Sequence, residues 1–146
     1  MAKARRVKPK GAGRSAPDSP RRLHGASCRA VRIGSHVWVT GSVAVRADGR
    51  VFGRGDPEAQ TRRCLDVIED ALRQVDARMD HVVRTRIFVV DIASWEAVSR
   101  AHHARFAEHP PATSMVEVSA LLHPDTLVEI EAEAFIPEEA SLRRAS

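Results

Sequence analysis

The chain has few of the features that mark secreted and membrane proteins. Its 146 residues include two cysteines, Cys28 and Cys64, which lie in different predicted elements. So few cysteines predict no disulfide framework, and we expect two free thiols. No apolar run approaches the roughly 20 residues that span a bilayer, and the N-terminus lacks the apolar segment of a secretory signal. We therefore expect a cytoplasmic protein that does not enter a membrane.

Basic residues are concentrated at the N-terminus. Residues 1–22 hold eight of the 23 Lys and Arg residues and one of the 19 acidic ones, which leaves residues 23–146 with a net charge of −3. This mildly acidic remainder argues against a nucleic-acid-binding domain. The segment has no hydrophobic periodicity and is rich in Gly, Pro and Ser, so we expect a disordered tail. We expect one folded domain over residues 23–137 and a flexible tail over 138–146.

The basic tail has three interpretations. It is a solvated extension, a weak polyanion-binding segment, or an organellar transit peptide, since it is rich in Arg and poor in acidic residues. Pro9, Pro17 and Pro20 disfavour the amphipathic helix that a transit peptide needs. The solvated extension is the simplest interpretation.

The stretch from Pro110 to Pro137 carries the strongest pattern. Alternation of apolar and polar residues predicts two strands, Thr113–Val118 and Thr126–Phe135, separated by a Leu-Leu-His-Pro-Asp break. In the second strand the even-numbered residues are apolar and predict a core face. The opposite face carries three carboxylates, which repel one another and require water, cations or a function.

The remaining elements complete an α+β pattern. Strands are expected at Cys28–Ile33, His36–Ser42 and His81–Val90, and helices from Asp56 to about Val75 and from Trp95 to about Glu108. Asp56 and Ser94 are the expected helix caps. Turn signals leave room for a further strand before the first helix. We therefore expect a mixed sheet of about six strands, with two helices covering one face.

The face without helices is expected to mix charged and apolar residues. In the strand His81–Val90, alternation assigns Val83, Thr85, Ile87 and Val89 to the core and directs Arg84, Arg86 and Phe88 to the other face. Trp38, Met115 and Leu127 are expected on that second face as well. Part of such a face is too apolar to stay fully exposed to water, so we expect self-association through it.

Two groups that resemble reactive sites have simpler interpretations. Cys64 lies inside the apolar stripe of the first helix, which favours a buried structural thiol over a nucleophile. His102 and His103 are adjacent on the second helix, so their side chains point about 100° apart and cannot share an ion. We expect no metal site and no cofactor.

Five stretches match, in order and spacing, the pattern of a known family. They are His36–Ser42, Gln60 with the helix to Val75, Val82–Asp91, Pro111–Val118 and Leu127–Ala132. With them the chain resembles the RidA/YjgF family, the reactive-intermediate (imine/enamine) deaminases, over residues 23–137. The resemblance implies a chorismate-mutase-like fold and a homotrimer whose sheets form a central barrel, with a small-molecule ligand in each cleft between subunits.

The resemblance also assigns site residues. Glu129 matches the catalytic glutamate of the family, Thr40 stands where a serine is usual, and Met115 stands where many members have a cysteine. Thr113 replaces the arginine with which deaminating members bind the substrate carboxylate. Because threonine cannot form a bidentate ion pair with a carboxylate, the usual means of holding 2-imino acids is missing.

Arg86 stands where deaminating members have a small residue, and by strand parity it shares a face with Phe88. Two interpretations remain open for Arg86. It supplies charge in the cleft in place of residue 113, or it forms a salt bridge to Glu117 or Glu131. With Thr113, Met115 and Thr40, Arg86 and Phe88 complete the expected substrate-binding set.

Three functions follow from these observations. The first is a cofactor-free hydrolase or deaminase of a small imine or enamine, with Glu129 as the acid/base. The second is a trimer of the same fold that binds a small ligand without turning it over, which the loss of the arginine favours. The third, an activity on nucleic acid, has only the basic tail in its support.

Overall fold

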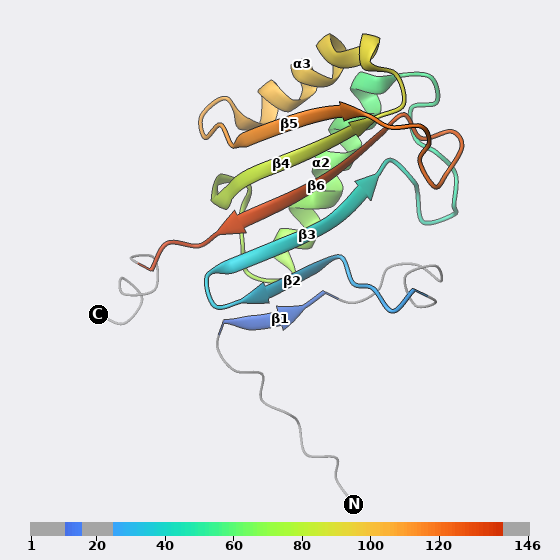
Figure 1. Cartoon of the computed structure of the whole chain (residues 1–146). Coiled ribbons are helices and arrows are strands. Elements are labelled where there is room, and N and C mark those ends of the chain that lie inside the picture. The colour runs from blue at the N-terminus through green and yellow to red at the C-terminus, as the bar shows by residue number, and fades with distance from the viewer. Residues whose placement is uncertain (1–10, 16–24, 139–146) are drawn as a thin grey trace, which may run out of the picture.

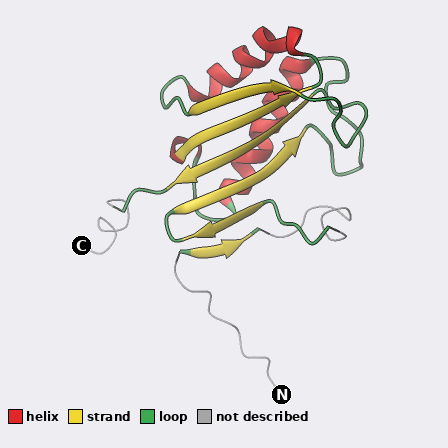
Figure 2. Ribbon diagram, viewed as in Figure 1, coloured by secondary structure: helices red, strands yellow, loops and turns green. Residues whose placement is uncertain are grey.

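The computed structural model describes residues 11–15 and 25–138. They form a six-stranded mixed sheet with two helices on one of its faces (Figures 1 and 2). The sequence predicts this layering and number of strands, but the further strand expected before the first helix is only an isolated bridge between Val45 and Val51, and the sixth strand is Ala12–Arg14. The strand order is β1-β2-β3-β6-β4-β5, where β5 runs parallel to β4 and the other neighbours are antiparallel. The elements are β1 Ala12–Arg14, β2 Ala30–Ile33, β3 His36–Val43, α2 Pro57–Arg73, β4 Val82–Val89, α3 Trp95–Phe106, β5 Ala112–Glu117 and β6 Val128–Phe135, with 3-10 turns at Met79–His81 and Ile92–Ser94.

Helix α2 supplies much of the core. The Asp56 carboxylate accepts a hydrogen bond from the Ala59 amide at 2.9 Å, so the predicted cap is confirmed. The apolar stripe of α2 packs against the central strands, and its fully buried members are Cys64, Leu65, Ile68, Ala71 and Leu72. Ser94 precedes α3 but makes no capping bond. Its hydroxyl donates instead to the Asp91 carbonyl at 2.6 Å.

Strand β6 lies between β3 and β4 and has the predicted alternation. Its apolar residues Val128, Ile130, Ala132 and Ala134 are buried under the helices, and Glu129, Glu131 and Glu133 point to the other side. We call that other side the open face. No helix in the described part of the chain is long and apolar enough to cross a membrane.

Two β-bulges change which residues face the core. Between Val82 and Arg84 the chain advances two positions while β6 advances one, so Val82 is buried and Val83 is 47% exposed. The prediction that Val83 faces the core is therefore wrong, because an inserted residue reverses the alternation. A second bulge lies between Val39 and Ser42 on β3 and contains Thr40 and Gly41.

The first strand was not predicted. Ala12–Arg14 pairs with β2 at the edge of the sheet, and Ser15 accepts a hydrogen bond from the Ala30 amide at 2.8 Å. The prediction that residues 1–22 are disordered is thus wrong for this short segment, whose Ala-Gly-Arg sequence has no strand signature. Residues 1–10, 16–24 and 139–146, which include most of the predicted tails, lie outside the described part.

Strand β5 places Met115, a predicted open-face residue, on the helix side. Ile87, which is buried in the core, stands beside Met115 in the parallel ladder, and Met115 packs against the same core. Leu127, at the entrance to β6, also packs against the core. The expectation that Met115 lies on the open face is therefore wrong. Apolar side chains still reach that face, where Trp38 on β3 is 41% exposed and Val116 on β5 is 48% exposed.

Candidate functional site

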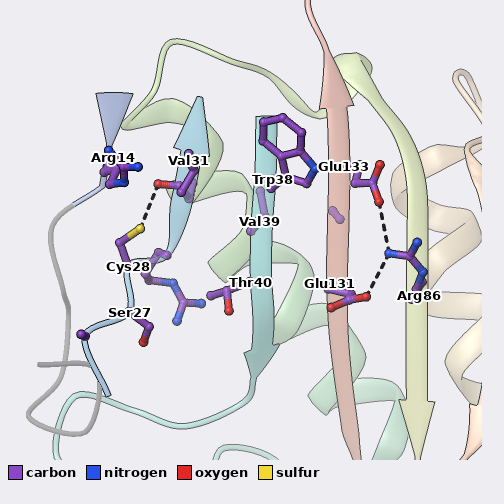
Figure 3. A pocket seen from close by; sticks show the side chains of 14 residues that line it. Arg14, Ser27, Cys28, Val31, Trp38, Val39, Thr40, Arg86, Glu131 and Glu133 are labelled. Atoms are coloured by element: carbon purple, nitrogen blue, oxygen red, sulfur yellow. Dashed lines mark hydrogen bonds and ion pairs between the residues drawn. The ribbon is translucent and has the colours of Figure 1, made fainter. Parts of the chain in front are cut away.

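A pocket of about 450 Å³ lies on the open face, over β2, β3, β6 and β4 (Figure 3). Trp38 and Thr40 line it from β3, and Arg29 lines it from the residue before β2. Arg86 and Glu131 line it from the neighbouring strands β4 and β6. The pocket therefore combines an aromatic ring, a hydroxyl and groups of both charges.

Arg86 is held by two carboxylates at one side of the pocket. Its Nη1 atom lies 3.1 Å from Oε1 of Glu131 and 3.1 Å from Oε1 of Glu133, so the guanidinium crosses from β4 to β6 (Figure 3). The expected salt bridge to Glu131 is confirmed. Glu117, the other expected partner, instead accepts a hydrogen bond from the Ile92 amide at 3.0 Å. A charged role for Arg86 toward a ligand stays a prediction.

Glu129 lies just beyond the pocket, in the middle of the sheet. It is half-buried and stands opposite Phe88 on β4 and Val43 on β3. Its carboxyl group occupies the space beside Gly41, where a Cβ atom would overlap Oε1 and would lie 2.8 Å from Cδ. Because only glycine leaves this space open, the bulge at Thr40 and Gly41 receives the carboxylate against its backbone.

Arg29 approaches the same bulge from the side of β2. It is 7% exposed, and its Nη2 atom donates to Oγ of Ser42 at 3.0 Å. The Thr40 amide donates to the Arg29 carbonyl at 3.0 Å, which joins the two backbones. Burial of a guanidinium carries a large desolvation cost unless opposite charge and hydrogen bonds compensate for it. The bulge is therefore flanked by a buried cation and a carboxylate.

The thiol of Cys64 lies beneath this group on α2. Burial and, to a smaller extent, the negative charge of Glu129 raise its pKa to about 12, although the positive charge of Arg29 acts to lower it. A thiol with such a pKa stays protonated at neutral pH and is a poor nucleophile. The interpretation of Cys64 as a structural thiol is thus supported, and Cys28, which is half-buried, is also free.

Thr113 lies on the helix side of β5, away from Glu129 of the same chain. Its Oγ1 atom is 2.8 Å from Oγ1 of Thr85, which in turn is 2.9 Å from Nε2 of His102 on α3. Burial lowers the pKa of His102 and favours the neutral imidazole. These three side chains form a hydrogen-bonded chain from α3 to the edge of the sheet. Within the described residues, no group of three or more His, Cys, Asp or Glu side chains is arranged to hold a metal ion.

The structure brings together part of the predicted site. Glu129, Thr40, Arg86 and Phe88 share the open face, whereas Thr113 and Met115 face the helices. Sequence reasoning missed two further residues. The signal for Arg29 was strand alternation, since it has the parity of Val31, which stands opposite Trp38 of the open face. Gly41 gave no signal, because nothing in the sequence shows which side chain approaches it.

Relatives with known sequences match most of the chain. A family model described as endoribonuclease L-PSP matches residues 19–136. Uncharacterized protein SCO2049 of Streptomyces coelicolor is 32% identical over 107 residues, which are 73% of this chain and 79% of that protein. The 3-aminoacrylate deaminase RutC of Acinetobacter baylyi is 31% identical over 107 residues, which are 73% of this chain and 84% of the relative.

Solved structures agree with this result. Rv2704 of Mycobacterium tuberculosis, described as a member of the YjgF/YER057c/UK114 family, is 42% identical and superposes with a TM-score of 0.79, over 86% of this chain and 99% of that one. The YjgF gene product of E. coli is 30% identical with a TM-score of 0.72, over 88% of this chain and 98% of the other. With its sheet order, its two helices and these matches, the chain belongs to the YjgF/RidA family.

Proposed function

We propose that the protein hydrolyses a small imine or enamine, and that Glu129 transfers protons between water and the substrate nitrogen. The observation that carries this proposal is the placement of the Glu129 carboxyl group against Gly41, beside a pocket lined by Thr40 and Arg86. A carboxylate fixed on a sheet, rather than on a loop, keeps a constant position relative to a bound ligand. The relative named as a 3-aminoacrylate deaminase supports the reaction class.

The chemistry needs one group that both accepts and returns a proton. Water adds to the imine carbon, and the Glu129 carboxylate passes a proton from that water to the imine nitrogen, so that a carbinolamine forms. The carboxylate then accepts the proton of the carbinolamine hydroxyl and passes it to the nitrogen, the carbon–nitrogen bond breaks, and ammonia leaves as the carbonyl product forms. An enamine enters the same sequence after a proton shifts to its carbon. No redox change occurs, so the proposed steps need no redox cofactor.

The complete site forms between subunits in this proposal. Thr113 and Met115 face away from Glu129 within one chain, so they reach a Glu129 cleft only on a neighbouring chain. The exposed side chains of Trp38 and Val116 favour association of the open face with another subunit. A homotrimer with its open faces inward and a ligand in each cleft between subunits would bury these apolar side chains. It would also bring Thr113 and Met115 of one subunit to Glu129 of the next.

Thr113 narrows the substrate class. A hydroxyl cannot replace a guanidinium as a bidentate partner for a carboxylate, so substrates that depend on that contact bind weakly. The same substitution favours a second function, a trimer of this fold that binds a small ligand without turning it over. The two functions differ in whether ammonia is released.

Ammonia release from three substrates tests the proposal. We would assay the imine derived from 2-aminoacrylate, 3-aminoacrylate itself and an aminomuconate-type enamine, each against spontaneous hydrolysis. The wild type is expected to accelerate at least one of them, and Glu129→Gln is expected to lower kcat by about 100-fold, as is typical for loss of a general acid/base. Saturable binding of these compounds without acceleration by the wild type would instead establish the binding function.

Gly41→Ala tests the placement of the carboxylate without removing it. The new methyl group would overlap Oε1 of Glu129 and force the carboxyl group to move. The backbone at Gly41 is not in the left-handed region, so alanine adds no backbone strain. We expect kcat to fall at least tenfold while the melting temperature changes by a few degrees. Gly13→Ala is the control, since nothing lies within 4 Å of its added Cβ, and equal activity of the two variants would contradict the assignment.

A further inference from the structure

Arg29 is a charged side chain in an unusual position. It is 7% exposed, it precedes the short strand β2, and its guanidinium turns toward the bulge of β3 rather than toward water. Arginine is rarely buried to this extent unless an opposite charge lies near it. The position of Arg29 therefore calls for a functional or structural partner of negative charge.

Arg29 and Glu129 converge on two adjacent residues. The guanidinium donates to the hydroxyl of Ser42 at 3.0 Å, and the Glu129 carboxyl group occupies the space beside Gly41. The two charged groups therefore approach the bulge from opposite neighbouring strands, β2 and β6. Their opposite influence on the pKa of Cys64 is an independent sign that both charges lie near the same thiol.

The other neighbours of Glu129 described above do not supply a positive charge to its carboxyl group. Phe88 and Val43, its partners on β4 and β3, carry no charge. Arg86 is bound to Glu131 and Glu133, the next two carboxylates along the open face of β6. The Cys64 thiol below is neutral, since burial raises its pKa to about 12.

We propose that Arg29 is a positioning residue for Glu129, and that its guanidinium keeps this carboxyl group ionised and in place beside Gly41. An opposite charge within about 4–6 Å favours the ionised form of a carboxyl group. In the reaction proposed above, an ionised Glu129 is ready to accept a proton from the attacking water at neutral pH. Only this catalytic consequence rests on the proposed function, because the effect on the carboxyl group is a property of the folded protein.

Carbon-13 NMR of the glutamate carboxyl groups tests the proposal without a substrate. The Glu129 signal is assigned by its loss in Glu129→Gln, and its titration is compared in the wild type, Arg29→Gln and Arg29→Lys. We expect Arg29→Gln to raise the pKa of Glu129 by at least about one unit, the size typical of losing a nearby opposite charge, and Arg29→Lys to restore most of the difference.

Arg32→Gln is the matched control. Arg32 lies on β2, three residues after Arg29, and donates to the carbonyls of Gly34 and Val75, on the helix side. The substitution Arg32→Gln also removes one positive charge, but at a different place, so it is expected to leave the titration of Glu129 unchanged. A Glu129 pKa that is the same in Arg29→Gln as in the wild type, or an equal shift in Arg32→Gln, would overturn the proposal.

A double-mutant cycle covers the case in which Arg29→Gln folds poorly. Arg29→Gln, Glu129→Gln and the double variant are unfolded in urea, and Arg29→Met, which also removes the charge, is used in place of Arg29→Gln if the latter is insoluble. Coupled residues are expected to differ from additivity by at least tenfold in the unfolding equilibrium constant. Additive effects would overturn the proposal.

Activity separates this proposal from the proposed function. If the wild type releases ammonia, Arg29→Gln is expected to lower kcat and to move the acidic limb of the pH profile upward, with little change in KM. A higher KM with an unchanged kcat would instead make Arg29 a ligand contact and overturn the positioning role. If no substrate is turned over while the NMR shift and the coupling are found, the proposed function fails and the role of Arg29 stands.

Discussion

His102 makes the stability of the protein depend on pH. Burial lowers its pKa, and burial lowers the pKa of His81 as well, so both rings resist protonation in the folded state. The unfolded chain binds these protons near pH 6.5, the ordinary value for histidine. The two neutral rings therefore make their full contribution to the free energy of unfolding above about pH 6.5. This contribution is lost as the pH falls through that value toward the folded-state pKa.

We expect the free energy of unfolding to decrease between pH 7.5 and pH 5.5, and to decrease less in His102→Gln. Urea unfolding at the two pH values measures the difference. His103→Gln is the control, because His103 is the exposed neighbour on the same helix. An identical pH dependence in the wild type and in His102→Gln would show that burial of this ring does not control its protonation.

Gln60 joins helix α2 to the segment that leads into β6. From the first turn of α2, its buried amide donates to the carbonyls of Gly53 and Asp125 at 3.3 and 3.1 Å and accepts from the Leu127 amide at 2.7 Å. Leu127 is two residues before Glu129, so this amide sets where β6 begins.

Replacement of Gln60 by leucine is expected to destabilise the fold. The change keeps the approximate volume but leaves up to three buried backbone groups without their partner, at on the order of 1 kcal/mol each. We expect a decrease of about 3 kcal/mol in the free energy of unfolding, measured in urea. Gln74→Leu, at the exposed C-terminal end of α2, should change it far less. Similar losses in both variants would contradict this role of Gln60.

At the level of elements, periodicity predicted most of the fold. The alternation in β6 placed Glu129 on the open face, and the apolar stripe of α2 identified its core residues, because each pattern depends on local geometry alone. Val83 and Met115 were misplaced for nonlocal reasons. A bulge reverses the alternation before Val83, and the ladder with β4 decides which face of β5 carries Met115. The same limit hid Gly41, whose role depends on a side chain from another strand.

For the whole molecule, the open face predicts association of subunits. Trp38 is 41% exposed on that face, and Trp95 is 52% exposed at the start of α3 on the helix side. We expect Trp38→Glu to shift the protein toward the monomer in light scattering after size-exclusion chromatography, because a charge would be buried at the interface. Trp95→Glu serves as the control and should leave the mass unchanged. A monomeric wild type at micromolar concentration would contradict the proposed trimer.

The hydrogen-bonded chain of His102, Thr85 and Thr113 can run in two directions. If Nε2 of the ring carries a hydrogen, Thr85 receives it and donates onward, and Thr113 can direct its own hydrogen to the Pro111 carbonyl, 3.3 Å away. If Nε2 is bare, both hydroxyl groups turn round, and Thr113 offers only lone pairs to a group beyond it. The tautomer of His102 on α3 thus decides whether the hydroxyl group of Thr113 donates or accepts a hydrogen bond.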